Sequence, residues 1–379
     1  MLNERLHQEN SLLAGCLEAE YLRVFRQEPL EKLGGALDSM GVRYSLYPTL
    51  TGLHQYLSPC SVRVPIAITV EPDQSSPSLW EFICETSAKT HLPIKIVGGG
   101  TNLYVPDSIG ELNSIFIRFS GKTPPEEHLI GAGLLRFSAG TRTACAVRRA
   151  MDLGYDMSTL AGIPGTMGGA VCNNAGISDK GVNTADLVER IETFNFLTGK
   201  KTAFIPKEIP GFFGQRTSLF RRIPDKYAIT EVVVGLDHVG FNEARERVLR
   251  RLEKRKAKDM EARHTAGSFY SNRIPDEIAQ AIEPQLKYIL RDEDFERVGS
   301  RVLARHVILA AARDLSVKGA YWTPNFAFLK VGQETTTYDV FQLIDETEER
   351  IRQIFKLEHL DSWLHQEVEF LKQQECYTD

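Results

Sequence analysis

The sequence predicts an α+β protein of two or three domains, and three observations support this prediction. The chain has 379 residues, which exceeds the size of a typical single domain. Apolar residues recur at helical spacing near both ends of the chain. Between these ends, short apolar runs alternate with helical patterns and glycine-rich turns. We expect three parts, comprising residues 1–59, 60–237 and 238–379.

Residues 1–59 are predicted to form a helical amino-terminal extension. Apolar residues recur at steps of three and four before Pro29, and the pattern resumes at Leu30 and continues to Gly41. The segment carries no recognisable chemistry. One interpretation is a helical arm that binds a partner.

Residues 60–237 are predicted to alternate strands and helices. The first unit is a strand at 65–70, a helix near 79–88 and a strand at 94–97 that runs into three glycines. Later elements are strands at 114–119, 129–131 and 228–236 and a helix near 143–153. A second glycine-rich loop follows that helix.

Residues 238–379 contain two long helical patterns. The first, at 242–262, is rich in Arg and Lys, but acidic residues are interspersed and aromatic residues do not accompany them. This mixture is typical of a solvated helical face rather than a nucleic-acid patch. The second pattern, near 338–355, places apolar residues on one side, and a short strand around 367–371 follows it.

Composition and charge exclude several classes of protein. Hydrophobic residues make up 42% of the chain and charged residues 25%, as in ordinary folded proteins. The net charge of −5 provides no positive excess for a nucleic-acid partner. Apolar runs are too short to span a membrane, and the charged amino terminus lacks the apolar centre of a signal peptide. We therefore expect a cytoplasmic protein without nucleic-acid or membrane partners.

The six cysteines indicate neither a metal site nor a redox site. They lie far apart, and no pair has the CxxC spacing of such sites. Isolated cysteines are more often small buried hydrophobes or inert thiols. We predict that the protein binds no metal.

The first glycine-rich loop follows the strand at 94–97. Gly98, Gly99 and Gly100 permit backbone conformations that other residues avoid, so main-chain N–H groups can approach a diphosphate closely. Thr101 and Asn102 add side-chain donors. Leu103 occupies the place of the third glycine of the dinucleotide fingerprint, which excludes a Rossmann motif.

The second glycine-rich loop, LAGIPGTMGGAVCNNAG at 160–176, is the more specific signal. Its repeated glycines, one proline and two asparagines are incompatible with a long regular helix or strand. A single glycine cluster is usually a structural turn. Two such loops in an α+β chain favour a site that wraps a flat, charged cofactor.

The segments GGGTNLYVPD and AGIPGTMGGAVCNNAG resemble the two flavin-binding signatures of the UDP-N-acetylenolpyruvoylglucosamine reductase (MurB) family. The resemblance implies a two-subdomain FAD-binding domain of the vanillyl-alcohol-oxidase (PCMH) type at 60–237 and a smaller α+β substrate-binding domain at 238–379. It also implies non-covalent FAD, NADPH as hydride donor, a nucleotide-sugar substrate and a monomer. The implied FAD contacts are Val97, Gly98, Gly99, Gly100, Thr101, Asn102, Leu103, Ala161, Gly162, Ile163, Pro164, Gly165, Thr166, Gly168, Gly169, Ala170, Asn173, Asn174, Ala175, Gly176 and Ile229.

Three further segments are similar to motifs of the same family and occur in the same order. They are FGQRTSLFRR at 213–222, HTAGSFYSN at 264–272 and LHQEVEFL at 364–371. The resemblance assigns the catalytic roles to Arg216 as the fixed positive charge, Ser268 as the proton donor and Glu367 as the acid that polarises the enol oxygens. It also implies substrate contacts by Asn272 and Asn325.

The chain departs from the family pattern on the substrate side. Ser271-Asn272-Arg273 replaces a Lys-Asn-Pro element, and Thr323 stands where a histidine is expected. Residues offered as replacements for the lost cation are Arg263, His264, Arg273 and Lys318. Two alternatives therefore remain: a paralogue of the same fold that acts on a different substrate, and a flavin-binding interaction protein without turnover.

Overall fold

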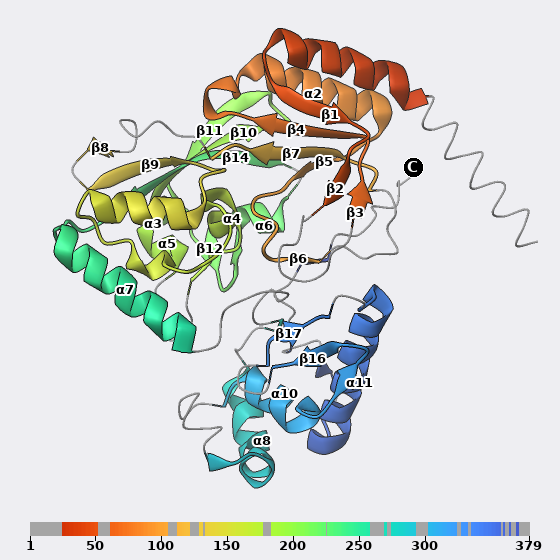
Figure 1. Cartoon of the computed structure of the whole chain (residues 1–379), viewed down its shortest axis with the longest axis vertical. Helices are drawn as coiled ribbons and strands as arrows, with labels where there is room; N and C mark the ends of the chain where they lie inside the picture. Colours follow the sequence, from red (N-terminus) through yellow and green to blue (C-terminus); the bar gives the residue numbers. More distant parts are fainter. Residues whose placement is uncertain are drawn as a thin grey trace, which may run out of the picture.

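The computed structural model describes most of the chain as two bodies of secondary structure (Figure 1). The N-terminal body extends to residue 257, and the C-terminal body comprises the elements from residue 269 to residue 364. The α+β fold predicted from the sequence is confirmed. The described residues are 25–51, 61–104, 112–121, 129–131, 133–176, 183–224, 226–257, 269–270, 274–292, 302–323, 327–332, 335–357, 359–360, 364 and 369–370.

The first sheet of the N-terminal body has the strand order β1-β4-β7-β5. Strands β4, β7 and β5 are parallel to one another, and β1 is antiparallel to β4. Helix α2 (Pro77–Thr90) connects β4 to β5. The strands are β1 (Arg43–Leu46), β4 (Ile66–Val70), β5 (Ile94–Ile96) and β7 (Ile115–Phe119), and a separate hairpin joins β2 (Thr49–Thr51) to β3 (Ser61–Arg63). The first glycine loop therefore begins at the end of β5, a strand of this sheet.

A helix over residues 25–39 covers this sheet together with α2. Leu30, Leu33 and Leu37 point into the core, at the three- and four-residue steps seen in the sequence. The helix ends before Gly41, which has the left-handed φ of +65° that favours glycine. Beyond it the chain forms β1 and β2, so the prediction of helix throughout 1–59 is wrong for residues 43–51. Residues 1–24 and 52–60 lie outside the described part.

The second sheet is antiparallel, with the order β11-β10-β14-β9-β8. Its strands are β8 (Leu129–Gly131), β9 (Leu134–Ser138), β10 (Val188–Asn195), β11 (Lys200–Phe204) and β14 (Tyr227–Gly235). Phe194 of β10 stacks on Trp80 of α2, with ring centroids 5.1 Å apart. The two sheets therefore share part of one core.

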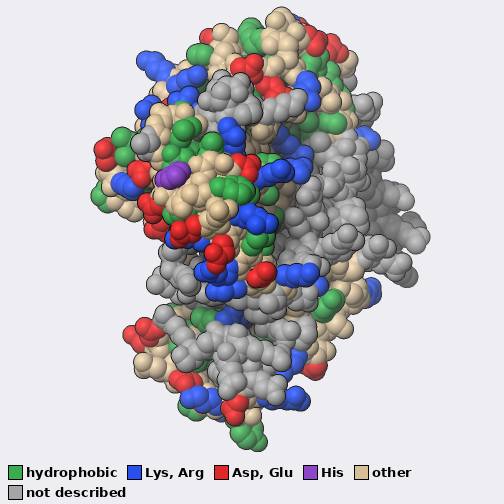
Figure 2. Space-filling model, turned by 60° about the vertical axis from the view of Figure 1, so that its left-hand side comes forward, with side chains coloured by type: hydrophobic (Ala, Val, Ile, Leu, Met, Phe, Trp, Pro, Cys, Tyr) green, Lys and Arg blue, Asp and Glu red, His purple; other side chains and the backbone are tan. Residues whose placement is uncertain are grey.

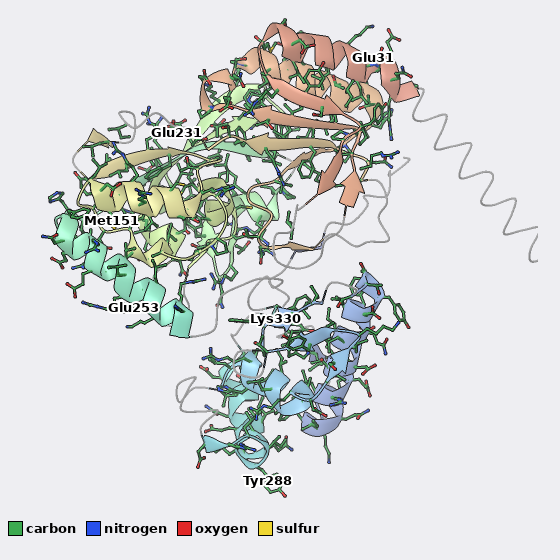
Figure 3. The ribbon with its side chains drawn as sticks, viewed as in Figure 1. Glu31, Met151, Glu231, Glu253, Tyr288 and Lys330 are labelled. Atoms are coloured by element: carbon green, nitrogen blue, oxygen red, sulfur yellow. The ribbon has the colours of Figure 1, made fainter. Side chains whose placement is uncertain are left out.

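Several helices and short elements complete the N-terminal body. They are η1 (Pro72–Gln74), α3 (Thr143–Asp152), η3 (Ser158–Leu160), α4 (Met167–Cys172), α5 (Thr184–Leu187), η4 (Pro206–Glu208), the β12 (Phe213–Gly214) and β13 (Thr217–Ser218) hairpin, α6 (Leu219–Arg222) and α7 (Phe241–Ala257). Helix α7 packs against α3 and η3. Met151 on α3 and Glu253 on α7 mark these two helices in Figure 3.

The C-terminal body has a core of its own around a small sheet, β15-β16-β17. Its elements are α8 (Asp276–Ile289), α10 (Ala304–Ala312), β15 (Ser316–Val317), β16 (Ala320–Trp322), β17 (Leu329–Lys330) and α11 (Thr337–Phe355). Trp322 is buried and donates a hydrogen bond of 2.8 Å from its indole N–H to the Thr347 hydroxyl. This bond fixes α11 to the small sheet.

The end of the chain returns to the N-terminal body. Strand β18 (Glu369–Phe370) pairs in parallel with β6 (Leu103–Tyr104), the strand that directly follows the first glycine loop. The terminal strand predicted around 367–371 is thereby confirmed. This pairing joins the carboxyl-terminal segment, which follows the C-terminal body in the sequence, to the edge of the glycine loop.

Candidate functional site

The two glycine-rich loops meet at the centre of the N-terminal body. A Cβ atom on Gly98 would lie 2.6 Å from Thr166 Oγ1, and one on Gly99 would lie 2.8 Å from Gly165 Cα. No side chain tolerates such distances, so glycine is required at both positions of the first loop. The two backbones are in direct contact.

The second loop is held rigidly by its neighbours. The Thr143 hydroxyl donates to the Ile163 carbonyl, and the Thr143 N–H donates to the Gly165 carbonyl at 3.1 Å. Thr166 accepts from the Gly169 N–H at 3.3 Å and thereby caps α4. The loop is therefore fixed from α3 on one side and from α4 on the other.

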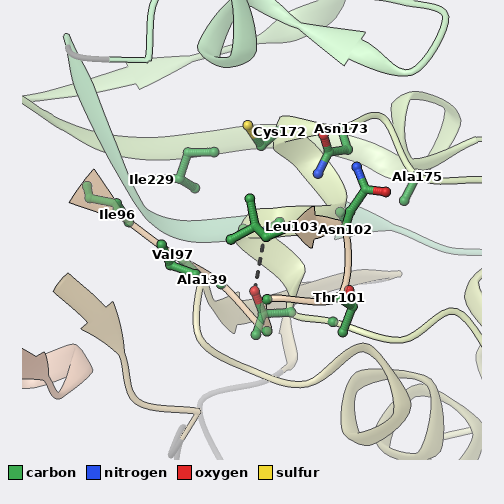
Figure 4. A pocket seen from close by; sticks show the side chains of 18 of the residues that line it. Ile96, Val97, Thr101, Asn102, Leu103, Ala139, Cys172, Asn173, Ala175 and Ile229 are labelled. Carbon is green, nitrogen blue, oxygen red and sulfur yellow. Dashed lines mark hydrogen bonds between the residues drawn. The ribbon is translucent and has the colours of Figure 1, made fainter. Parts of the chain in front are cut away.

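The contact between the loops forms one wall of a cavity of about 390 Å³, a volume within the usual range for small-molecule sites. Figure 4 shows Ile96, Val97 and Ile229 toward one side of this cavity and Asn102 and Asn173 toward the other. The cavity thus has an apolar part and a polar part.

Most of the predicted cofactor contacts line this cavity. They are Val97, Gly98, Gly99, Gly100, Thr101, Asn102, Leu103, Ile163, Pro164, Gly165, Thr166, Gly168, Gly169, Ala170, Asn173, Ala175, Gly176 and Ile229. Segments more than sixty residues apart in the sequence are therefore brought together at one site.

Three predicted contacts do not line the cavity. Ala161 is buried in the core of the second sheet. The Asn174 side chain donates to the Gly214 carbonyl at 2.9 Å and accepts from the Ala185 N–H at 3.0 Å, so it supports the loop from behind. Gly162 lies under the side chain of Arg255.

The described lining is strongly basic. Lys95, Arg216, Arg221 and Arg255 line the cavity, and no Asp or Glu is present among its described lining residues. A described lining that holds four cations and no carboxylate favours an anionic ligand. The cavity therefore fits a molecule that carries phosphate or carboxylate groups.

Arg216 occupies a constrained position between β12 and β13. Its φ of +52° is uncommon for a residue with a side chain and indicates a conformation that the surrounding structure imposes. Its guanidinium donates from Nη1 to the Gly176 carbonyl at 2.8 Å. Arg221 donates both to the Arg216 carbonyl at 3.0 Å and to Asn173 Oδ1 at 2.8 Å. The position of Arg216 is thus tied to the second glycine loop.

Arg255, near the end of α7, is a lining residue that the sequence-based site did not include. Burial lowers its pKa to about 10, and the positive charges of Arg251 and Arg216 act in the same direction. Spacing gives a signal that could have found it. Ala244 and Val248 are buried, and Arg251 and Arg255 continue the same helical face at steps of three and four.

The remaining predicted site residues Ser268, Glu367, Asn272 and Asn325 lie outside the described residues. So do three of the four suggested replacement cations, Arg263, His264 and Arg273. The fourth is Lys318, whose Nζ atom lies 3.6 Å from Asp339 Oδ1. Lys318 is not among the described residues that line the cavity.

No group of three or more His, Cys, Asp or Glu side chains in the described part could hold a metal ion. Among the helices described here, none is both long enough and apolar enough to cross a membrane.

The chain is similar to an FAD-binding family and to several named reductases. A family model described as an FAD binding domain matches residues 81–202, which include both glycine loops. The chain is 28% identical over 306 residues to the UDP-N-acetylenolpyruvoylglucosamine reductase of Leptospira interrogans, covering 80% of this chain and 85% of the relative. The chain is therefore similar to the UDP-N-acetylenolpyruvoylglucosamine reductases over most of its length. The match to an FAD binding domain and these relatives indicate an FAD-dependent oxidoreductase, and the resemblance stated from the sequence is confirmed.

Two further proteins are similar to this chain, one in sequence and one in fold. The enzyme of the same name from Anaeromyxobacter sp. (strain K) is 33% identical over 183 residues, covering 48% of this chain and 51% of the relative. The crystal structure of UDP-N-acetylenolpyruvylglucosamine reductase (MurB) from Thermus caldophilus has the same fold, with a TM-score of 0.56 and 22% identity. That match covers 87% of this chain and 99% of the Thermus chain.

The residues of the cavity fit FAD. The loop glycines leave the space that a Cβ would fill, and the basic lining suits a diphosphate. The apolar side at Ile96, Val97 and Ile229 suits a flat aromatic ring.

Proposed function

We propose that the chain reduces the enolpyruvyl group of UDP-N-acetylglucosamine enolpyruvate to the lactyl ether of UDP-N-acetylmuramate, a step in peptidoglycan precursor synthesis. The observation that carries the proposal is the single cavity in which both glycine loops and Arg216 meet. The names of the relatives supply the substrate. FAD, bound without a covalent bond, would transfer hydride to the substrate with NADPH as the donor.

Arg216 supplies the fixed positive charge in this proposal. Addition of hydride to an enolpyruvyl group builds negative charge beside a carboxylate, so the site needs cations and donors aimed at it. The hydrogen bond from Arg216 to the Gly176 carbonyl fixes the guanidinium at the cavity lining. A planar guanidinium that is already oriented can meet a carboxylate with two donors.

Ser268 and Glu367 complete the proposed catalytic group. Ser268 would donate the proton to the carbon next to the carboxylate, and Glu367 would polarise the enol oxygens. Asn272 and Asn325 would bind the substrate. Support comes from the chain itself, because Glu367 precedes β18 by two residues and β18 pairs with the strand after the first glycine loop.

The proposal extends to the organisation of the protein. We assign residues 60–237 to FAD binding, residues 238–379 to substrate binding, and residues 1–59 to an extension whose second half packs on the first sheet. We expect a cytoplasmic monomer that uses NADPH.

Consumption of NADPH by the FAD-loaded protein tests this function. Absorbance at the nicotinamide band is followed with and without UDP-N-acetylglucosamine enolpyruvate, and the product is identified by mass spectrometry. We expect NADPH consumption that depends on the substrate and yields UDP-N-acetylmuramate. A protein with intact flavin that shows no substrate-dependent consumption would exclude the proposed substrate and favour a paralogue.

A further inference from the structure

Helix α7 places one basic side chain, that of Arg255, at the cavity lining. Arg255 lies across Gly162, a residue of the second glycine loop with a φ of +74°. A Cβ on Gly162 would lie 2.6 Å from Arg255 Cδ and 2.8 Å from its Nε. The φ favours glycine there, and a Cβ would require the flexible Arg255 side chain to shift. Arg255 therefore lies across the second glycine loop and lines the cavity.

The arginines of α7 have two different environments. Arg247 bonds to Asp156 and Glu243, and Arg250 bonds to Glu246, so these side chains are neutralised at the surface. Acidic and basic side chains alternate on this face of the N-terminal body (Figure 2). Arg255 is half-buried, and no ion pair that joins two described residues includes it. The end of the helix therefore differs from its surface-facing part.

The charged groups that shift the pKa of Arg255 are also positive. Arg216 and Arg251 repel it, and burial removes much of its hydration. Its pKa nevertheless lies about three units above neutral pH, so the guanidinium is charged in solution near pH 7. A half-buried cation beside two others is unfavourable unless an anion completes the site.

We propose that Arg255, together with Arg216, forms an anion subsite of the cavity that binds a diphosphate group of a nucleotide. Two nucleotides are candidates for the same chemistry: FAD itself and the nucleotide-sugar substrate. The inference rests on the nucleotide chemistry of the proposed function, but it concerns a residue that no motif assigned. Arg255 is a binding residue here and needs no role in proton or hydride transfer.

The test replaces Arg255 with methionine, which keeps an unbranched stem over Gly162 and removes the charge. The matched control is Arg250→Met, on the same helix but exposed and paired with Glu246. One arm measures the dissociation constant of FAD for the apoprotein by flavin fluorescence. The other arm measures the dissociation constant of UDP-N-acetylglucosamine for the FAD-loaded protein by calorimetry. Both arms are repeated at two salt concentrations.

Arg255→Met should raise the dissociation constant of one of the two ligands by about tenfold to a hundredfold, because a charge-assisted hydrogen bond is lost. The binding of that ligand should also depend less on salt. Arg250→Met should change the dissociation constant of neither ligand by more than about twofold. Weaker FAD binding places the subsite at the cofactor diphosphate, and weaker nucleotide-sugar binding places it at the substrate. Wild-type affinity for both ligands in a folded Arg255→Met variant overturns the proposal.

Thermal unfolding of the apoprotein separates a ligand role from a structural one. Removing an uncompensated buried charge should leave the Tm of the apoprotein unchanged or raise it, whereas removing a structural residue should lower it. A lowered Tm with unaltered ligand affinity overturns the proposal.

A second variant, Arg255→Lys, is used if the methionine variant does not fold. A measurable loss of its affinity for one nucleotide supports the subsite, and wild-type affinity for both nucleotides contradicts it. Failure of the wild-type protein to bind FAD would instead contradict the proposed function.

Discussion

The two sides of the cavity are built in different ways. On the glycine-loop side, the protein backbone forms the wall, and Gly98 and Gly99 are fixed by contacts that no other residue could make. The proposed chemistry depends instead on side chains from distant segments, with Arg216 in the turn of a hairpin and hydrogen-bonded to the second glycine loop. A wall made of backbone leaves a dense local pattern in the sequence. A site made of dispersed side chains leaves single residues whose meaning depends on the fold.

The largest expected effect concerns the side-chain part. Ser268→Ala should leave reduction of the flavin by NADPH nearly intact and should slow substrate reduction by about a thousandfold or more, because only the second half-reaction needs the proton. Stopped-flow absorbance measures the two half-reactions separately. Ser271→Ala, in the same segment, is the control. Equal losses in both half-reactions of Ser268→Ala would indicate a structural role for the serine.

The backbone part is tested by Gly99→Ala. The new Cβ would meet Gly165 Cα at 2.8 Å, so the two loops must separate. We expect FAD affinity to fall at least about tenfold and the free energy of unfolding to fall by about 1–3 kcal/mol. Gly35→Ala is the control, because its Cβ would have no neighbour within 4 Å and it lies in a helix. That control should stabilise the protein by about 0.5–1 kcal/mol. Unchanged FAD affinity in Gly99→Ala would contradict the account of the loops.

The connection between the two sides is tested by shortening the chain. A protein that ends at residue 368 keeps Glu367 but loses β18 and its pairing with β6. We expect FAD content to stay normal while kcat/KM for the substrate falls about tenfold, equivalent to about 1.4 kcal/mol. A chain ending at residue 371 retains the strand and is the control. Normal turnover without β18 would show that the pairing does not position the substrate side.

The smallest expected effect concerns the attachment of α7. Burial raises the pKa of Asp156, but hydrogen bonds from Arg247 and from the Ser158 N–H outweigh it and lower the pKa below its ordinary value. A lowered pKa stabilises the fold above the unfolded-state pKa near 4, and this stability disappears as the pH falls through the folded-state pKa. Asp156→Asn should therefore cost about 1 kcal/mol at pH 7 and much less near pH 3, measured by urea unfolding. An equal cost at both pH values would exclude the ionic contribution.

The elements and the cofactor side could largely be predicted from the sequence. The strand at 66–70, the helix at 337–355 and the strand at 369–370 fall where periodicity and residue type placed them. The glycine loops were recognisable because close backbone contact demands glycine at several nearby positions. Their meeting at one cavity also agrees with the expectation of a single cofactor site.

Other features could not be predicted for identifiable physical reasons. Helical periodicity before Gly41 gave no information about the strands after it, because a left-handed glycine ends one pattern and short strands carry little periodicity. Asn174 resembled a ligand contact, but its amide is used within the protein. Arg255 was interpreted as part of a solvated helix, since charge alone does not show which face a neighbouring loop covers.

An anaerobic mixing experiment tests the central claim, that this cavity holds FAD and that the bound flavin reduces an enolpyruvyl nucleotide-sugar. The FAD-loaded protein is reduced with one equivalent of NADPH and then mixed with UDP-N-acetylglucosamine enolpyruvate. The account predicts that the oxidised-flavin absorbance returns with formation of an equivalent amount of UDP-N-acetylmuramate. A flavin that stays reduced in the presence of saturating substrate would contradict it.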